Sequence, residues 1–81
     1  MSYAKKIQQQ QKDQLQLLIE WFSSQAKLAH FIKVSPQVVS NWVARGRISA
    51  KCAIKAEAIT NGEFKKEQLR PDVLTWEKGN K

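Results

Sequence analysis

Large apolar side chains recur at intervals of three or four residues along this chain, and that spacing predicts amphipathic helices. The clearest pattern begins at Asp13 and places four apolar residues on one helix face: Leu15, Leu18, Ile19 and Phe22. A second pair, Leu17 and Trp21, falls on a different face of the same helix. Trp21 therefore either wraps around the edge of the core or, together with Leu17, meets a partner chain.

The two ends of the chain differ from this middle part in composition. Residues 1–12 are polar and rich in glutamine, so they form either a frayed arm or a solvated first turn of the helix that follows. We expect residues 13–73 to form the domain and residues 74–81 to form a C-terminal tail. Val73, Leu74 and Trp76 are apolar, and Trp76 either covers the core as a lid or contacts another subunit.

Two short helices are predicted between Gln25 and Arg45, and the first runs from about Gln25 to Ile32. Ser23 or Ser24 caps its N-terminus, because a serine hydroxyl accepts a hydrogen bond from the unpaired N–H groups of a helix start. Ala29 takes the position of closest approach to another helix. The inward-facing side chains of this helix are expected to be Leu28, Phe31 and Ile32.

The second of these helices, about Pro36 to Arg45, has strong boundary signals. Ser35 is a preferred N-cap residue, and Pro36 lacks only an N–H group that would be unpaired there anyway. Gly46 is the expected residue at the C-terminal end. The apolar side of this helix holds Val38, Val39, Trp42 and Val43. The polar side holds Gln37, Ser40, Asn41, Ala44 and Arg45.

A fourth helix follows at about Ala50 to Thr60, with Ser49 as its cap and Asn61-Gly62 as its stop. Its small or slim residues suit close packing between helices: Ala53, Ile54, Ala56, Ala58 and Ile59. A short helical turn from Lys65 to Leu69 is closed by Arg70-Pro71. Since no stretch alternates long enough to make a strand, we predict an all-α bundle of four to five short helices, the alternative being one edge strand in the tail.

The charge of the chain is strongly positive and unevenly distributed. The formal net charge is +7 and the sequence pI is about 9.9, as expected of a nucleic-acid-binding domain. No acidic residue lies between Glu20 and Glu57, where a carboxylate would repel phosphate. The same window contains six basic residues: Lys27, Lys33, Arg45, Arg47, Lys51 and Lys55. The alternative is that many small domains are basic without binding nucleic acid.

Few residues in the chain have the chemistry of a catalytic or metal site. Cys52 is the single cysteine, which excludes an internal disulfide and a cysteine-rich zinc site and fits a buried core residue. His30 has no second histidine, cysteine or acid patterned around it, so we expect a surface or half-buried histidine. Without positioned acid–base partners or a glycine-rich phosphate loop, the sequence predicts no enzyme, no cofactor, no metal and no small-molecule ligand.

No apolar segment of the sequence approaches the ~20 residues that a membrane-spanning helix needs. Lys5 and Lys6 precede no apolar stretch of the kind that a signal peptide requires. We therefore expect a protein of the cytoplasm with no membrane partner.

The spacing between residues 25 and 42 fits a helix-turn-helix. In this motif two helices pack at about 90–120° so that the second projects into the major groove of DNA. The packing requires a small residue where the helices cross, an apolar residue at the turn, and apolar residues on the inner side of the second helix. These positions are occupied by Ala29, Val34, Val39 and Trp42.

Seven residues at fixed offsets resemble the DNA-binding helix-turn-helix of the phage Cro and repressor superfamily: Gln25, Ala29, Val34, Ser35, Val39, Ser40 and Trp42. Four later segments are similar to the Cro-like YdaS group of prophage regulators: Ile48-Ser49-Ala50, Ala56-Glu57, Thr60-Asn61-Gly62 and Leu69-Arg70-Pro71-Asp72. The resemblance covers about residues 23–73. Many members have glycine where this chain has Lys33, so the turn either holds a side chain in an unusual backbone region or follows a different path.

The resemblance implies roles for individual residues. The helix 36–45 would enter the major groove and read base edges with Gln37, Ser40, Asn41 and Arg45. Contacts with the DNA backbone are implied for Gln25, Lys27, Lys33, Ser35, Arg47, Lys51 and Lys55. Gln25 would also brace the recognition helix. The implied function is a Cro-like repressor that binds a pseudo-palindromic operator as a homodimer. The alternative is an antitoxin-like or adaptor module that binds another protein.

Overall fold

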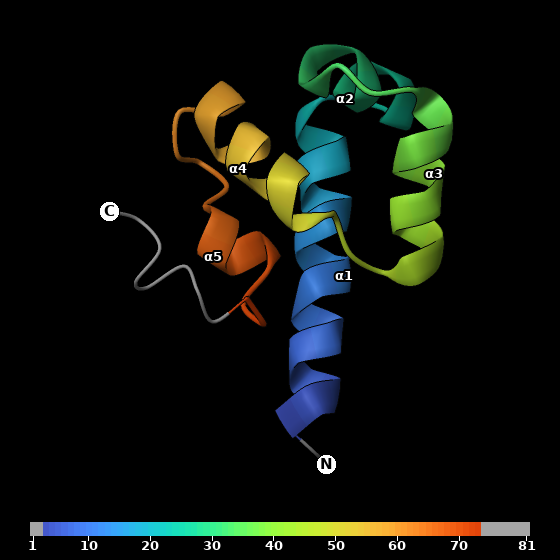
Figure 1. Ribbon diagram of the computed structural model, residues 1–81. Coiled ribbons are helices and arrows are strands. Elements are labelled where there is room, and N and C mark those ends of the chain that lie inside the picture. Colours follow the sequence, from blue (N-terminus) through green and yellow to red (C-terminus); the bar gives the residue numbers. More distant parts are fainter. Residues whose placement is uncertain (1–2, 74–81) are drawn as a thin grey trace.

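The computed structural model describes residues 3–73, and this part of the chain is all-helical, without strands (Figure 1). Its helices are α1 (Tyr3–Trp21), α2 (Gln25–Ile32), α3 (Pro36–Arg45), α4 (Ala50–Ile59) and α5 (Lys66–Leu69). The predicted all-α class is therefore confirmed. Leu74 and Trp76, which the sequence suggested as a lid or subunit contact, lie outside the described residues.

Serine side chains begin three of the helices, as the sequence predicted. The hydroxyl of Ser24 accepts a hydrogen bond from the Lys27 N–H at 3.1 Å. The hydroxyls of Ser35 and Ser49 accept corresponding bonds from Val38 at 3.4 Å and Cys52 at 3.3 Å. Each bond pairs one of the N–H groups that a helix start leaves without a partner. Because these bonds are local, the helix starts can be predicted from the sequence.

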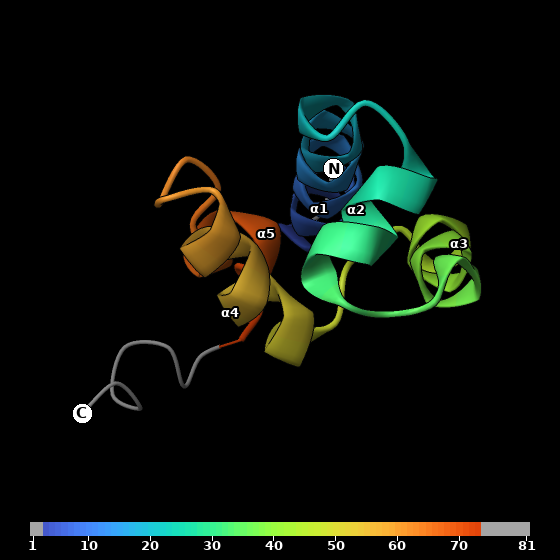
Figure 2. The same ribbon diagram turned by 90° about the horizontal axis from the view of Figure 1, so that it is seen from above.

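α1 is the central element of the fold. In both views α3 lies on one side of α1, while α4 and α5 lie on the other (Figures 1 and 2). α2 crosses between the two sides and packs against α1, α3 and α4. The buried core draws on all five helices of the described chain and on the segments around them: Leu15, Leu18, Ile19, Leu28, Ala29, Ile32, Val39, Trp42, Ile48, Cys52, Ala53, Ala56, Phe64 and Leu69.

α1 begins at Tyr3, so residues 3–12 form the N-terminal half of this helix and not a frayed arm. Gln11 is almost fully buried, and its side-chain N–H donates to the Asp72 carboxylate at 2.6 Å. Further along, the Trp21 ring packs edge-on against Phe64 with ring centroids 5.8 Å apart, although half of Trp21 is exposed. Trp21 therefore lies at the edge of the core, and Leu17 is also half-exposed.

Several side chains that we expected to point inward are exposed. Phe31 is 54% exposed because Leu28 and Ile32 share the face of α2 that meets the core, and Phe31 is turned about 100° away from Ile32. Its ring packs against Phe22, with centroids 5.3 Å apart. The same correction applies to other predicted packing residues, which are also exposed: Val43, Ile54, Ala58 and Ile59. Short helices present only one narrow face to a small core.

The turn between α2 and α3 keeps its lysine in the left-handed region. Lys33 has φ 71° and ψ 48°, and its N–H and that of Val34 both donate to the Ala29 carbonyl, at 2.8 and 3.0 Å. Of the two paths that we considered, the chain therefore takes the one with a side chain in an unusual backbone region. This conformation costs a residue other than glycine about 1–2 kcal/mol. The two carbonyl bonds help to hold Lys33 in it.

Candidate nucleic-acid interface

α3 is anchored on one side and exposed on the other. Val39 and Trp42 are buried in the core, and Val38 packs against it. Ala29 of α2 is 1% exposed, and Val34 of the turn is partly buried against the same core. The polar side of α3 is exposed, as its sequence pattern predicted: Gln37, Ser40, Asn41, Ala44 and Arg45. A rigidly seated helix thus carries an outward row of polar side chains.

Two hydrogen bonds order this exposed row. The Ser40 hydroxyl donates to the side-chain oxygen of Gln25 at 3.2 Å, which ties the middle of α3 to the start of α2. The Gln37 side-chain N–H donates to the Asn41 side-chain oxygen at 3.1 Å, one helical turn further on. Among the described residues, the side-chain oxygen of Gln37 and the side-chain nitrogen of Asn41 have no hydrogen-bond partner. They leave one acceptor and one donor facing outward.

The C-terminal end of α3 carries basic side chains and meets the N-terminal half of α1. Arg45 is exposed, and the Arg47 side chain is 51% exposed, with its guanidinium 4.0 Å from the Asp72 carboxylate. Beside them lies a polar cavity of about 280 Å³, which we call the α1–α3 hollow. Its lining comprises Gln8, Gln11, Lys12, Ala44, Arg45, Gly46 and Arg47.

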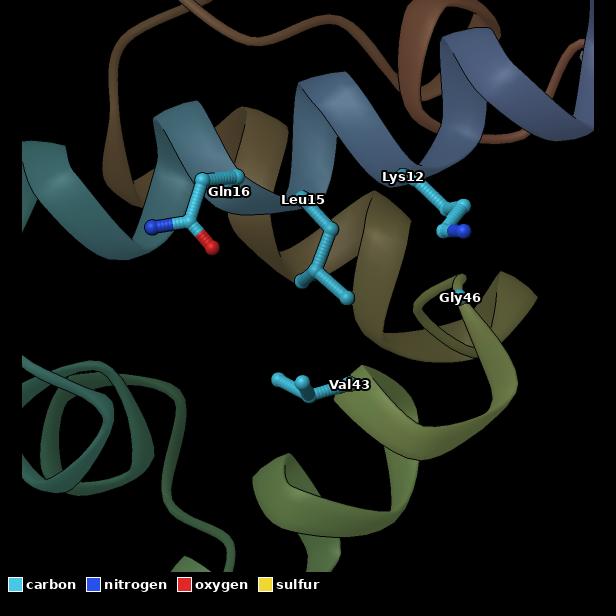
Figure 3. A pocket seen from close by; sticks show the side chains of 5 residues that line it. All are labelled: Lys12, Leu15, Gln16, Val43 and Gly46. Atoms are coloured by element: carbon cyan, nitrogen blue, oxygen red, sulfur yellow. The ribbon is translucent and has the colours of Figure 1, made fainter.

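The sequence pattern did not place Lys12 or Gln8 in the site, because residues 1–12 are polar and suggested an arm or a solvated first turn. A signal was present, since Lys12, Gln11 and Gln8 precede Leu15 at helical spacing. In the folded chain Lys12 also lines a second, smaller cavity of about 110 Å³ between α1 and α3, together with Leu15, Gln16, Val43 and Gly46 (Figure 3).

A partly buried ionic network holds this end of the molecule together. Arg70 donates two hydrogen bonds to Asp72, both at 2.8 Å, and a third to the Ile48 carbonyl at 3.1 Å. The hydrogen bonds from Arg70 lower the pKa of the Asp72 carboxyl, and the same pair raises the pKa of Arg70, although burial opposes both shifts. The network joins α1, the loop after α3 and the end of α5. In the Leu-Arg-Pro-Asp segment, the arginine and the aspartate therefore have a structural role, which is to form this network.

The structure brings only some of the predicted contact residues together. Lys27 and Lys33 are exposed on α2 and at its C-terminal end, while the Ser35 hydroxyl is already used as the cap of α3. Lys51 and Lys55 are exposed on α4, which lies on the other side of α1 from α3 in both views (Figures 1 and 2). These two lysines therefore lie on a different helix from the polar row of α3.

Other chemistry in the described residues is sparse. His30 is exposed and packs edge-on against Phe31, with ring centroids 5.3 Å apart. Cys52 is a free, buried thiol. Within residues 3–73 no group of three or more histidine, cysteine, aspartate or glutamate side chains is placed to hold a metal ion. Over the same range, none of the helices combines the length and the apolar composition needed to cross a bilayer.

Comparison with known proteins gives one match. No curated protein and no solved structure matches this chain. The family described as "Bacterial toxin YdaS" matches residues 15–78, which is most of the sequence and includes α2 to α5 with the larger part of the core. The chain therefore belongs to this family, a small family associated with bacterial prophages.

Proposed function

We propose that this protein is a sequence-specific DNA-binding regulator that places α3 in the major groove, with α2 and α3 acting as a helix-turn-helix. The observation that carries the proposal is the exposed polar row of α3, seated on Val39 and Trp42 and braced by the bond from Ser40 to Gln25. Preorganisation of this kind lowers the entropy that binding must otherwise overcome.

Charge supports the same proposal. α2, α3 and the first part of α4 fall in the acid-free window between Glu20 and Glu57, in a chain with a formal net charge of +7. Each basic side chain that neutralises a phosphate releases a counterion, so binding should weaken steeply with salt. Lys27, Lys33 and Arg47 are exposed and suited to such contacts. Lys51 and Lys55 would meet DNA only at the flank of the site.

Gln37 and Asn41 are the proposed base readers. Their mutual hydrogen bond leaves one acceptor and one donor exposed, which matches the donor and acceptor that adenine shows in the major groove. A bidentate contact of this type contributes about 1–3 kcal/mol of discrimination between bases. Arg45, one turn beyond Asn41 on the same exposed side, would contact a guanine or a phosphate.

The biological role that we propose is that of a Cro-like prophage repressor in the bacterial cytoplasm. The protein would bind a pseudo-palindromic operator as a homodimer and act by occupancy, blocking polymerase, without catalysing a reaction. Two-fold symmetry would place the two copies of α3 one helical turn of DNA apart.

The test is fluorescence anisotropy with duplex DNA from upstream of the protein's own gene, compared with a scrambled duplex of equal length. We expect tighter binding to the first duplex. The double variant Gln37→Ala/Asn41→Ala should remove this preference, a loss of roughly 5–150-fold at about 1–3 kcal/mol, while binding to the scrambled duplex stays nearly unchanged. Gln9→Ala is the matched control, because Gln9 forms the same i to i+4 bond with Asp13 on α1. Equal loss on both duplexes would overturn the base-reading roles.

A second candidate is a toxin or antitoxin-like module that binds another protein. Two observations favour it: the family is described as a bacterial toxin, and several large apolar side chains are exposed. They include Leu17, Trp21, Phe31, Ile54 and Ile59. The anisotropy experiment separates the candidates, because only the DNA-binding regulator should prefer the upstream duplex. Growth arrest on expression that persists in Gln37→Ala/Asn41→Ala would support the protein-binding candidate.

A further inference from the structure

The α1–α3 hollow brings together cationic groups that are far apart in the sequence. Lys12 comes from α1, whereas Arg45 and Arg47 come from the end of α3 and the residue after its Gly46 cap. Gln8 and Gln11 complete the α1 side of a cavity of about 280 Å³. None of the described residues that line it is acidic. A cavity with this lining is suited to an anion.

Lys12 is positioned by direct packing on α3. A Cβ atom added at Gly46 would lie 2.9 Å from the Cγ of Lys12 and 3.4 Å from its Cδ, so the aliphatic part of Lys12 rests on the Gly46 backbone. Figure 3 shows the Lys12 side chain running from α1 along this end of α3. A lysine whose stem is packed against the protein keeps its ammonium group in solvent. The Lys12 ammonium group therefore lies at the edge of the proposed DNA-binding surface.

The Asp72 carboxylate, which contacts Arg47, does not cancel this charge. Asp72 already accepts two hydrogen bonds from Arg70 and one from Gln11. Its contact with Arg47 is at 4.0 Å, the longest of the ion pairs in the described chain, and half of the Arg47 side chain remains exposed. Because Arg70 neutralises Asp72, the positive charges of Lys12, Arg45 and Arg47 remain available to a ligand.

We propose that the α1–α3 hollow binds a backbone phosphate of the DNA and that Lys12, with Arg45 and Arg47, holds it. This inference rests on the proposed function. It gives α1 a role in DNA binding, because Lys12 would hold the duplex at the C-terminal end of α3. Since a phosphate carries no sequence information, the contact fixes how α3 sits in the groove and adds affinity on every sequence.

The test is the salt dependence of DNA binding by Lys12→Gln, measured on the upstream and scrambled duplexes. We expect the slope of log K against log salt to fall by about 0.9 for each protein copy bound, since each neutralised phosphate adds about that amount. Affinity should fall by the same factor on both duplexes. Lys65→Gln, which removes the same charge from the exposed N-cap residue of α5, is the matched control, and Lys12→Arg should keep the slope. Circular dichroism establishes that each variant is folded.

Three results would decide against the hollow or separate it from the DNA-binding proposal. An unchanged slope in Lys12→Gln, with the wild type still preferring the upstream duplex, overturns the phosphate site and leaves the proposed function standing. If the wild type binds no duplex, the proposed function falls, and an NMR titration with inorganic tripolyphosphate tests the hollow alone. Shifts of the Gly46 and Arg47 amides in the wild type but not in Lys12→Gln support an anion site there. Equal shifts in both, or none, overturn it.

Discussion

The α2–α3 pair and the corner formed by α1 with the Arg70–Asp72 segment are built in different ways. The α2–α3 pair is organised mainly by contacts over short sequence distances, namely serine caps three residues away and two carbonyl bonds at Lys33. The Gln25–Ser40 bond, which joins residues 15 apart, adds a longer link between the two helices. The α1 corner depends on contacts between distant residues, such as the bond from Gln11 to Asp72. One region could be anticipated from its sequence pattern, and the other required the folded chain.

The largest effect is expected in the α2–α3 pair, from Trp42→Ala. Trp42 is 3% exposed in the core, and removing a buried tryptophan side chain costs about 3–5 kcal/mol. For a domain of this size that loss is comparable with the whole free energy of unfolding. Urea denaturation followed by circular dichroism measures it. Val43→Ala is the control on the same helix, since Val43 is 41% exposed, and equal losses in the two variants would contradict the anchoring of α3 by Trp42.

The α1 corner should be nearly as sensitive to Arg70→Ala. The Arg70 side chain is 14% exposed, and its removal takes two hydrogen bonds from Asp72 and one from the Ile48 carbonyl. Hydrogen bonds to charged groups contribute about 1.5–3 kcal/mol, so we expect a loss of that size in the free energy of unfolding. Arg45→Ala, an exposed control, should change stability little. A loss below about 0.5 kcal/mol in Arg70→Ala would show that the corner does not depend on this network.

The same network predicts a pH dependence. The folded pKa of Asp72 is lowered by its hydrogen bonds from Arg70, so the unfolded state binds the proton more readily. The stabilisation is complete above about pH 4 and is lost as the pH falls through the folded pKa. The difference in unfolding free energy between wild type and Asp72→Asn should therefore shrink with acidification. A constant difference from pH 6 down to pH 2 would contradict this role of Asp72.

Gly46→Ala tests the junction between the two regions. Gly46 has φ +85°, so alanine there costs about 1–2 kcal/mol from backbone strain, and its Cβ would also meet Lys12 Cγ at 2.9 Å. Gly62→Ala is a matched control with φ +82° and open space apart from Lys65 Nζ at 3.9 Å. We expect Gly46→Ala to cost more by thermal denaturation, and Lys12→Ala to remove the excess. Equal losses of stability in Gly46→Ala and Gly62→Ala would show that the Lys12 side chain moves aside without an energetic penalty.

The smallest effect is expected at the turn between α2 and α3. Lys33→Gly relieves the left-handed strain but adds flexibility to the unfolded chain, so the net gain in stability should be at most about 1 kcal/mol. Lys33→Asn also suits this backbone region and removes the same charge. Both variants should bind DNA with a lower salt slope if Lys33 contacts phosphate. Destabilisation by either one would show that the lysine side chain itself supports the turn.

Errors in the sequence predictions follow the same division. The helix ends at Ser24, Ser35, Gly46 and Ser49 were predicted correctly because each depends on bonds to residues three or four positions away. The direction of Phe31 was wrong, because periodicity does not say which part of an apolar face a small core will cover. The proposed roles of Gln37, Asn41 and the basic residues stay predictions until DNA binding is measured.

The amino-acid sequence by itself determined the helical class, the boundaries of α2 and α3, the polar outer row of α3 and the acid-free basic window. These properties depend on local hydrogen bonding, periodicity and counting of charges. Only the tertiary structure decided that Lys12 lies on Gly46 and that Asp72 joins Arg70 and Gln11. Such contacts join residues that are distant along the chain, and no local pattern specifies them.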